Sequence, residues 1–94
     1  MINVFFRRYF VLTKTHLLTF TDEHSYKNPT EVIEMQQVDT VKSSPDETGN
    51  QFGFKMEIKG WTFYMYAESS EEKESWIGAI GKAMIKKSMI VDSD

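Results

Sequence analysis

The sequence contains no cysteine, which excludes a disulfide framework and any chemistry that needs a thiolate. It also has no apolar run near the ~20 residues that a membrane-spanning helix requires. No apolar core with a small-residue cleavage site follows the first residues, so they do not form a signal peptide. We therefore expect a cytoplasmic protein without a transmembrane segment, which can associate with a membrane only peripherally.

An excess of basic residues is also missing, since the net charge is −3. Nucleic-acid binding needs clustered lysine and arginine, and we therefore exclude nucleic acid as the main partner. The charge is unevenly distributed: residues 1–27 carry a local +2, residues 28–72 a local −6, and residues 73–94 a local +1. An anionic ligand is accordingly expected to meet the N-terminal part of the chain or the last helix, and not the middle of the chain.

Patterns that support catalysis or cofactor binding are not found. His16 and His24 lie in different predicted elements without zinc-ligand spacing, and no glycine-rich phosphate loop opens a helix. Neither a cysteine nucleophile nor a nucleophile elbow is present. The expectation is a protein that is not an enzyme and that has no cofactor and no metal.

Six segments are rich in β-branched and aromatic residues and alternate as strands do. They span residues 4–13, 16–21, 31–35, 37–42, 52–58 and 61–67. Residues 22–29, which contain Asn-Pro, and the turn-rich residues 43–50 are predicted loops. Within residues 4–13, alternation places Arg8 on the core-facing side with Phe10, and Arg7 on the opposite side.

A change of period after residue 69 indicates a helix. Apolar residues at 76, 77, 80, 83 and 84 form one helical face, and Ser69 followed by Glu72 has the form of a capping box. The spacing predicts an amphipathic helix over residues 70–87 with Trp76 in the core, followed by a frayed tail over 88–94. The whole chain, residues 1–94, is thus predicted to be one mainly β domain capped by one helix.

Three segments resemble a known family. Arg7-Arg8-Tyr9-Phe10-Val11-Leu12 is similar to the second strand of pleckstrin-homology (PH) domains. Residues 61–80, WTFYMYAESSEEKESWIGAI, resemble the last strand and helix of that family, and Pro29 with Glu31-Val32-Ile33 resembles the entry to its fourth strand. The resemblance covers residues 5–87. It implies a PH-like small antiparallel β-barrel or sandwich, of which about six strands are visible, capped by a C-terminal helix.

The chain departs from the family pattern at two places. The first strand of the family should lie upstream of residue 5, where only four residues remain. Phosphoinositide-binding members resemble one another in a basic-x-Arg motif on the second strand; Arg8 matches its arginine, but Phe6 stands at the other basic position. The third-strand aromatic of the pattern falls near Thr19.

The candidate lipid-binding residues are Arg8, Arg7, Lys14, His16 and Lys27. Arg8 is the strongest, because a guanidinium offers a bidentate fork to a phosphate; the alternative is a strand-end arginine that pairs with a nearby carboxylate. For the other four, a solvated surface role is the competing interpretation. Phe5 and Phe6 are adjacent, so one of them must face outward.

Two functions fit these observations. The first is a membrane-targeting module that binds anionic lipid headgroups, either a phosphoinositide or phosphatidic acid, with modest affinity and selectivity. The second is a protein-interaction or scaffold module that keeps the fold and has lost the phosphoinositide site. Fold alone does not decide between them.

Overall fold

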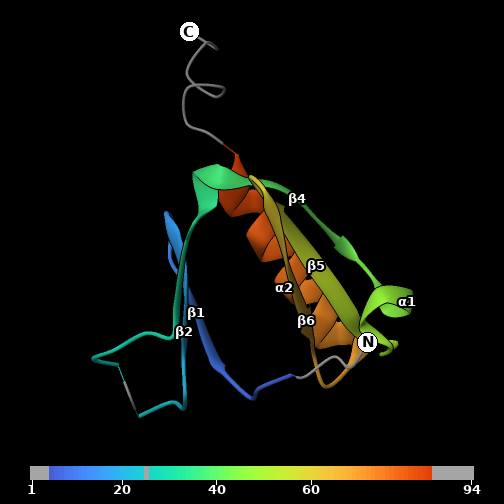
Figure 1. The fold of residues 1–94 in the computed structure, drawn as a ribbon, viewed down its shortest axis with the longest axis horizontal. Helices are drawn as coiled ribbons and strands as arrows, with labels where there is room; N and C mark the ends of the chain where they lie inside the picture. The colour runs from blue at the N-terminus through green and yellow to red at the C-terminus, as the bar shows by residue number, and fades with distance from the viewer. Residues whose placement is uncertain (1–4, 25, 86–94) are drawn as a thin grey trace, which may run out of the picture.

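Two antiparallel sheets of three strands each, together with one long helix, make up the fold (Figure 1). The computed structural model describes residues 5–24 and 26–85. Within them the strand order is β1-β2-β3 in the first sheet and β4-β5-β6 in the second. Each sheet is a meander, in which strands that follow one another in the chain lie side by side.

The first sheet contains β1 (Tyr9–Leu12), β2 (His16–Phe20) and β3 (Glu31–Glu34). Its register pairs Tyr9 with Phe20 and Leu12 with Leu17 across β1 and β2. The Thr13 hydroxyl accepts a hydrogen bond from the His16 N–H (3.0 Å) in the tight turn that joins them. Residues 21–24 and 26–30 then lie in the loop between β2 and β3. This loop therefore lies at the end of the sheet where β1 begins.

The second sheet contains β4 (Val38–Ser43), β5 (Gly53–Ile58) and β6 (Trp61–Tyr66). A 3-10 helix, η1 (Met35–Gln37), connects it to the first sheet. Gly60 turns the β5–β6 hairpin with a φ of 85°, a conformation that glycine adopts without steric cost. The short helix α1 (Pro45–Thr48) joins β4 to β5.

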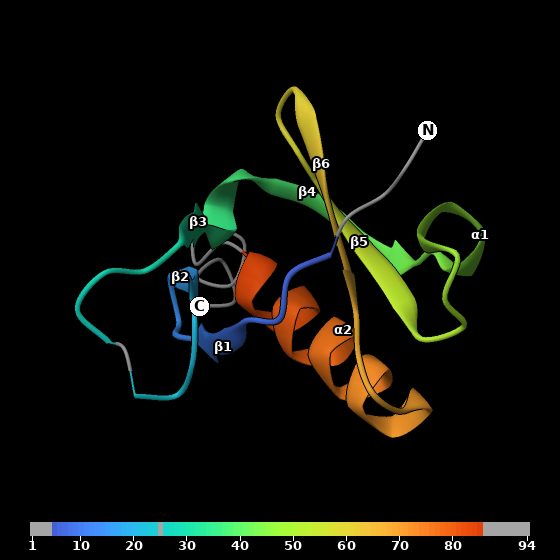
Figure 2. The same cartoon turned by 60° about the horizontal axis from the view of Figure 1, so that its bottom comes forward.

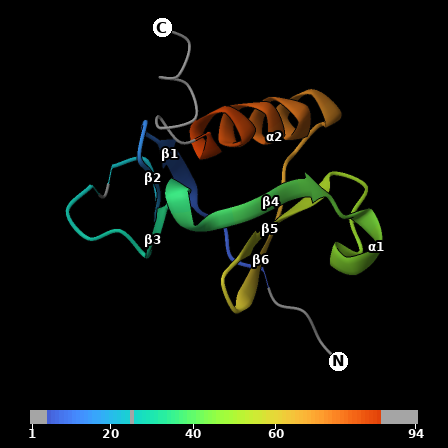
Figure 3. The ribbon, with the colours of Figure 1, turned by 90° about the horizontal axis from the view of Figure 1, so that it is seen from above.

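Helix α2 (Ser70–Met84) packs against β4, β5 and η1. The Ser69 hydroxyl accepts from the Glu72 N–H (3.1 Å), and the Glu72 carboxylate accepts from the Glu68 N–H (2.8 Å). This is the predicted capping box, with the carboxylate reaching one residue farther back than in the usual motif. Figures 2 and 3 show α2 along one side of the second sheet, with its C-terminal end next to the first sheet.

The core lies between the two sheets and α2. Alternation along β5 sends Phe54, Met56 and Ile58 inward, where they are buried. The rest of the buried apolar cluster is Leu17, Ile33, Met35, Val38, Met65, Ala67 and Ile80. Phe10, Leu12 and Trp76 pack against it while staying partly exposed. One cluster therefore holds both sheets and the helix together.

The structure confirms the mainly β architecture, all six strands and the C-terminal helix, and it corrects five details. The helix ends at Met84, with Ile85 as an extended C-cap, so its predicted end at residue 87 is wrong. Residues 35 and 37, predicted to lie in strands, belong to η1. The first strand begins at Tyr9, because Phe5–Arg8 pair with neither sheet. The predicted loop 43–50 holds α1, which Pro45 starts and Gly49 ends at a φ of 67°. Trp76, expected in the core, is half-buried. Residue 4, residues 86 and 87 of the predicted helix, and the predicted tail 88–94 lie outside the described residues. That residues 1–94 form one domain stays a prediction.

Candidate functional site

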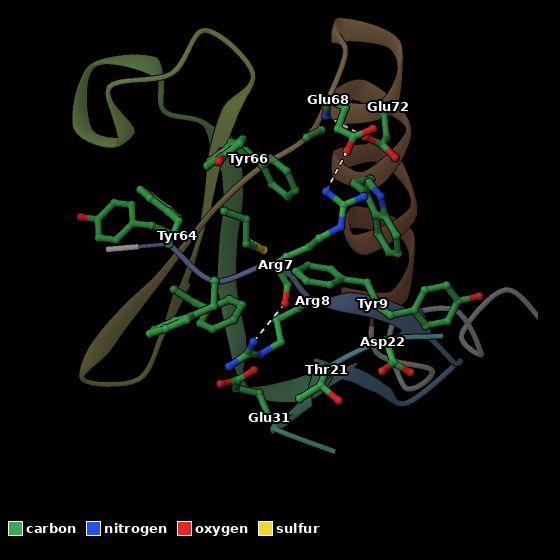
Figure 4. A pocket seen from close by; sticks show the side chains of 18 of the residues that line it. Arg7, Arg8, Tyr9, Thr21, Asp22, Glu31, Tyr64, Tyr66, Glu68 and Glu72 are labelled. Atoms are coloured by element: carbon green, nitrogen blue, oxygen red, sulfur yellow. Dashed lines mark hydrogen bonds and ion pairs between the residues drawn. The ribbon is translucent and has the colours of Figure 1, made fainter. Parts of the chain in front are cut away.

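A cleft of about 1350 Å³ lies where the edge of β1 faces the edge of β6 (Figure 4). Among residues 5–24 and 26–85, β1 pairs only with β2 and β6 only with β5, so no ladder of hydrogen bonds between described strands closes the wall between the sheets. Phe54, Phe63, Met65 and Trp76 give it an apolar floor. Its sides are lined by residues 5–10, by residues 21–24 of the β2–β3 loop and by Phe63–Ala67.

Arg8 lines this cleft at the start of β1 and is half-buried. Its Nη1 donates to the Arg7 carbonyl oxygen (3.0 Å), and its guanidinium carbon lies 5.1 Å from the centre of the Phe6 ring. Its Nε is buried and, among the described residues, has no hydrogen-bond partner. Figure 4 shows the Arg8 side chain directed toward Glu31. Arg8 thus places a positive charge in the cleft, and its hydrogen-bond donors are only partly used by the described residues.

Arg7 points the other way, toward the start of α2. Its Nη1 lies 3.4 Å from the Glu68 carboxylate, and the two side chains are 89% and 74% exposed. Such a surface pair contributes at most about 1 kcal/mol of stability. The predicted alternation of Arg7 and Arg8 is confirmed, and only Arg8 is held inward.

Glu31, opposite Arg8, is tied to the first sheet. Its carboxylate accepts hydrogen bonds from the hydroxyls of Thr19 and Thr30, the latter at 2.9 Å. Thr19 is fully buried. Thr19, which stands at the third-strand position of the family pattern, therefore holds Glu31 and is not accessible to a ligand.

Lys14 lies in the β1–β2 turn and His16 begins β2, both at the opposite end of β1 from Arg8. Because β1 rises about 3.4 Å per residue, four strand residues separate the two ends by more than ~10 Å. The His16 Nδ1 is hydrogen-bonded to the Thr15 hydroxyl (2.8 Å). The structure does not bring these two candidates together with Arg8, and neither lines the cleft.

Lys27 lies in the β2–β3 loop, at the same end of the sheet as Arg8. It lines a second hollow of about 470 Å³ together with Thr21, His24, Tyr26 and Asn28. Thr21 and His24 also line the main cleft, so the two hollows are neighbours. Lys27 itself lines only the second hollow and not the main cleft.

Aromatic side chains surround this mouth. Phe6 is 70% exposed and Tyr26 is 58% exposed, which is unusual for rings of this size. The Tyr26 ring contacts Tyr9 edge-on (centroids 6.2 Å apart) and Phe20 (5.3 Å). We call Phe6, Tyr9 and Tyr26 the aromatic rim. Sequence reasoning missed Tyr26, although a tyrosine alone in a polar loop could have indicated it.

Carboxylates, which sequence reasoning also missed, outnumber arginines around the cleft. The cleft is lined by two arginines, Arg7 and Arg8, and by six carboxylates: Asp22, Glu23, Glu31, Glu47, Glu68 and Glu72. The Lys55 Nζ (2.7 Å) and the Ser44 hydroxyl (2.7 Å) both donate to the Glu47 carboxylate. These bonds, that to Lys55 first, lower the pKa of Glu47 to about 2. Glu47 is thus already paired with a lysine, and the cleft lining as a whole has more acidic than basic side chains.

Among residues 5–24 and 26–85, no three histidine, aspartate or glutamate side chains are grouped so as to hold a metal ion. Over the same part of the chain, no helix has the length and apolarity to cross a membrane.

The model of the PH domain family matches residues 5–84 of this chain. The chain belongs to the PH domain family. The pleckstrin homology domain-containing protein 1 of Arabidopsis thaliana is 32% identical over an alignment of 93 residues, which covers 94% of this chain and 64% of that protein. The chain thus spans less than two thirds of that relative's length. PH domains commonly bind lipids or proteins.

Solved PH domains share the fold. The N-terminal PH domain of human ARAP2 superposes with a TM-score of 0.70 at 21% identity, covering 97% of this chain and 72% of that one. The PH domain of human KIAA0053 protein gives 0.73 at 21% identity, covering 89% and 78%. That of mouse Ethanol Decreased 4 protein gives 0.68 at 23% identity, covering 83% and 71%. The predicted PH-like architecture is confirmed.

Proposed function

We propose that this PH domain is a non-catalytic module that binds anionic membrane surfaces and recruits its protein to them. One observation carries the proposal: basic and exposed aromatic side chains occur together at the cleft mouth. Arg8 and Lys27 supply charge, while the aromatic rim supplies apolar surface. Aromatic rings are favoured at the headgroup level of a bilayer, and basic groups there are attracted to anionic lipid.

Arg8 is the proposed contact for a lipid phosphate. Its Nε has no partner within the described residues, and its guanidinium is held at the cleft mouth by the Arg7 carbonyl oxygen and the Phe6 ring. A phosphate oxygen would satisfy the buried donor, which is costly to leave unpaired. Lys27 is the second proposed contact.

The affinity is expected to be modest and the headgroup selectivity poor. Phe6 replaces one basic residue of the family pattern, Arg7 is paired with Glu68, and Lys14 and His16 lie at the other end of β1. Glu31 also lies in the direction of Arg8 (Figure 4). Each of these features lowers the positive potential that a multiply charged headgroup would meet.

A vesicle co-sedimentation assay tests the proposal. Phosphatidylcholine vesicles are compared with vesicles that also carry one phosphoinositide, phosphatidic acid or phosphatidylserine. We expect binding to the anionic vesicles that Phe6→Ser weakens severalfold. Val32→Ser is the matched control, because Val32 is exposed on β3 and does not line the cleft. Absence of binding to every anionic vesicle at low salt would refute the proposal.

The acidic lining favours a second candidate, a protein-interaction module. Six carboxylates against two arginines would attract a basic protein segment and repel a polyanion that enters the cleft. A domain that fails to bind vesicles yet retains a protein partner would establish this second function.

A further inference from the structure

Arg8 and Glu31 face each other on the inner side of the first sheet (Figure 4). Both side chains are half-buried, and both line the cleft. Arg8 immediately precedes β1 and Glu31 begins β3. Their position relative to each other is therefore set by the first sheet and does not depend on the gap between β1 and β6.

The Glu31 carboxylate is fixed through one of its two oxygens. Its Oε1 accepts hydrogen bonds from the hydroxyls of Thr19 and Thr30, and its backbone N–H donates to the Thr19 hydroxyl (3.0 Å). Thr19 is fully buried, so the carboxylate is anchored to the interior of the sheet. Its Oε2 accepts no hydrogen bond from the described residues. One carboxylate oxygen is thus held by the protein, and the other can accept from a ligand.

The Arg8 guanidinium is also held in place and offers hydrogen-bond donors. Its Nη1 donates to the Arg7 carbonyl oxygen (3.0 Å), and its guanidinium carbon lies 5.1 Å from the centre of the Phe6 ring. It is directed toward Glu31, yet within the described part of the chain no direct ion pair joins the two groups. A ligand group that satisfies both must accept from Arg8 and donate to Glu31.

A phosphodiester by itself meets only half of this requirement. Its oxygens accept from a guanidinium, but they have no proton to donate to a carboxylate. A hydroxyl beside the phosphate supplies the donor and leaves the negative charge of the headgroup intact, whereas an ammonium would neutralise it. Further phosphates bring more negative charge toward Glu31 and are repelled. The pair therefore matches one phosphate with a neighbouring hydroxyl.

From this arrangement we propose that Arg8 and Glu31 form a subsite for a phosphodiester headgroup that carries hydroxyl groups, such as glycerol or inositol. The Arg8 guanidinium donates to a phosphate oxygen, and the free Glu31 oxygen accepts from the neighbouring hydroxyl. Glu31 is then the residue that determines specificity among anionic headgroups. The inference rests on the proposed membrane-binding function and names the headgroup chemistry of that site.

Vesicle co-sedimentation of the whole chain tests the need for the hydroxyl. Phosphatidylcholine vesicles carry equal fractions of either phosphatidylglycerol or phosphatidylmethanol. Both added lipids are singly charged phosphodiesters, and only the first has hydroxyl groups. We expect the phosphatidylglycerol vesicles to bind about threefold more tightly. Vesicles with phosphatidylinositol bisphosphate should bind no more tightly than phosphatidylinositol vesicles of the same surface charge, because Glu31 repels the added phosphates.

Glu31→Gln tests the placement of the acceptor. Glutamine keeps the shape of the side chain and an oxygen for Thr19 and Thr30, but it removes the negative charge. The preference for phosphatidylglycerol over phosphatidylmethanol should fall from about threefold to about onefold, and binding to bisphosphate vesicles should rise about threefold. Glu34→Gln is the matched control, because it removes the same charge from an exposed position on β3 that does not line the cleft. It should leave the preference unchanged.

Soluble headgroups separate the subsite from the bilayer. Glycerophosphoglycerol, which has hydroxyl groups, and dimethyl phosphate, which has none, are titrated into the chain without lipid. The NMR signals of the Arg8 Nε–H and the Glu31 amide report binding. We expect glycerophosphoglycerol to shift both signals at concentrations at which dimethyl phosphate does not. Such shifts without vesicle binding would refute membrane recruitment and support the subsite.

Three results would overturn the subsite. The first is equal binding of the wild-type chain to phosphatidylglycerol and phosphatidylmethanol vesicles, a comparison that needs no variant to fold. The second is an unchanged preference in Glu31→Gln, once circular dichroism has shown that this variant folds. The third is an equal loss of preference in Glu34→Gln, which would indicate a general effect of charge. Vesicle binding without any headgroup preference would leave the proposed function standing and refute only the subsite.

Discussion

Trp76 packs edge-on against Phe10, with ring centroids 5.4 Å apart and ring planes inclined at 70°. The contact joins the middle of α2 to β1, and Trp76 also forms part of the cleft floor. Edge-to-face pairs of this kind stabilise by about 0.5–1.5 kcal/mol beyond the area they bury. Because β1 has no ladder with β6, this ring pair is one of the contacts that hold the first sheet against the helix.

Replacing Trp76 with alanine is expected to lower the free energy of unfolding by about 3 kcal/mol, the low end for a large aromatic, because the ring is half-buried. Trp76→Phe should lose less, since a smaller ring can still contact Phe10. Urea denaturation of both variants measures the difference. An unchanged midpoint for Trp76→Ala would contradict the role of α2 as the element that closes the core.

Lowering the pH should weaken the link between α1 and the second sheet. The pKa of Glu47 falls from its ordinary 4.5 to about 2 in the folded chain, chiefly through the Lys55 hydrogen bond. Because the pKa is lowered in the folded chain, the stabilisation that ionised Glu47 gives is present above pH 4.5 and is lost as the pH falls toward about 2. Urea midpoints measured from about pH 6 down to 2 should show a slope that Glu47→Gln reduces.

The control for this pH series is Glu34→Gln, which removes an exposed carboxylate on β3. Its slope should match that of the wild-type chain. If Glu47→Gln and Glu34→Gln had identical pH profiles, the Glu47–Lys55 link would have no measurable part in acid unfolding.

Gly53→Ala and Gly78→Ala should change the free energy of unfolding in opposite directions. A Cβ at Gly53 would lie 1.7 Å from the buried Thr48 hydroxyl, which donates to the Ser44 carbonyl oxygen (2.7 Å). We expect Gly53→Ala to destabilise the chain by about 1–3 kcal/mol through overpacking. A Cβ at Gly78, in α2, meets no atom within 4 Å, so Gly78→Ala should stabilise by up to about 1 kcal/mol. Thermal unfolding compares the two, and a shift of the same sign in both would be inconsistent with this geometry.

Membrane binding should depend on Arg8 far more than on Arg7. Arg8 lies half-buried at the cleft mouth, whereas Arg7 is exposed and paired with Glu68. Arg8→Ala is expected to abolish vesicle binding and Arg7→Ala to cost little, after circular dichroism has shown that both variants fold. Binding should weaken steeply with salt, because such contacts are screened within about 8–10 Å at physiological ionic strength. Equal losses in both variants would indicate diffuse attraction without a defined contact.

Much of the fold follows from local patterns in the sequence. The two-residue period identified all six strands, and the spacing of Trp76, Ile77 and Ile80 identified α2. The Ser69 cap was predictable because it depends on a residue three positions away. The opposite directions of Arg7 and Arg8 were predictable for the same reason, since alternation is a property of the extended backbone itself.

The existence of the cleft could not be predicted from the sequence and follows only from the tertiary structure. It lies between β1 and β6, which are more than forty residues apart in the chain, and no local period specifies which strand edges remain free. The same holds for Glu47 and Glu68, which come from separate connections and meet Arg7, Tyr64 and Lys55 only in the folded chain. Lys14 and Arg8, close in sequence, are instead separated by the length of β1. Local periodicity fixes where a side chain points on its own element, whereas a binding surface depends on how distant elements pack.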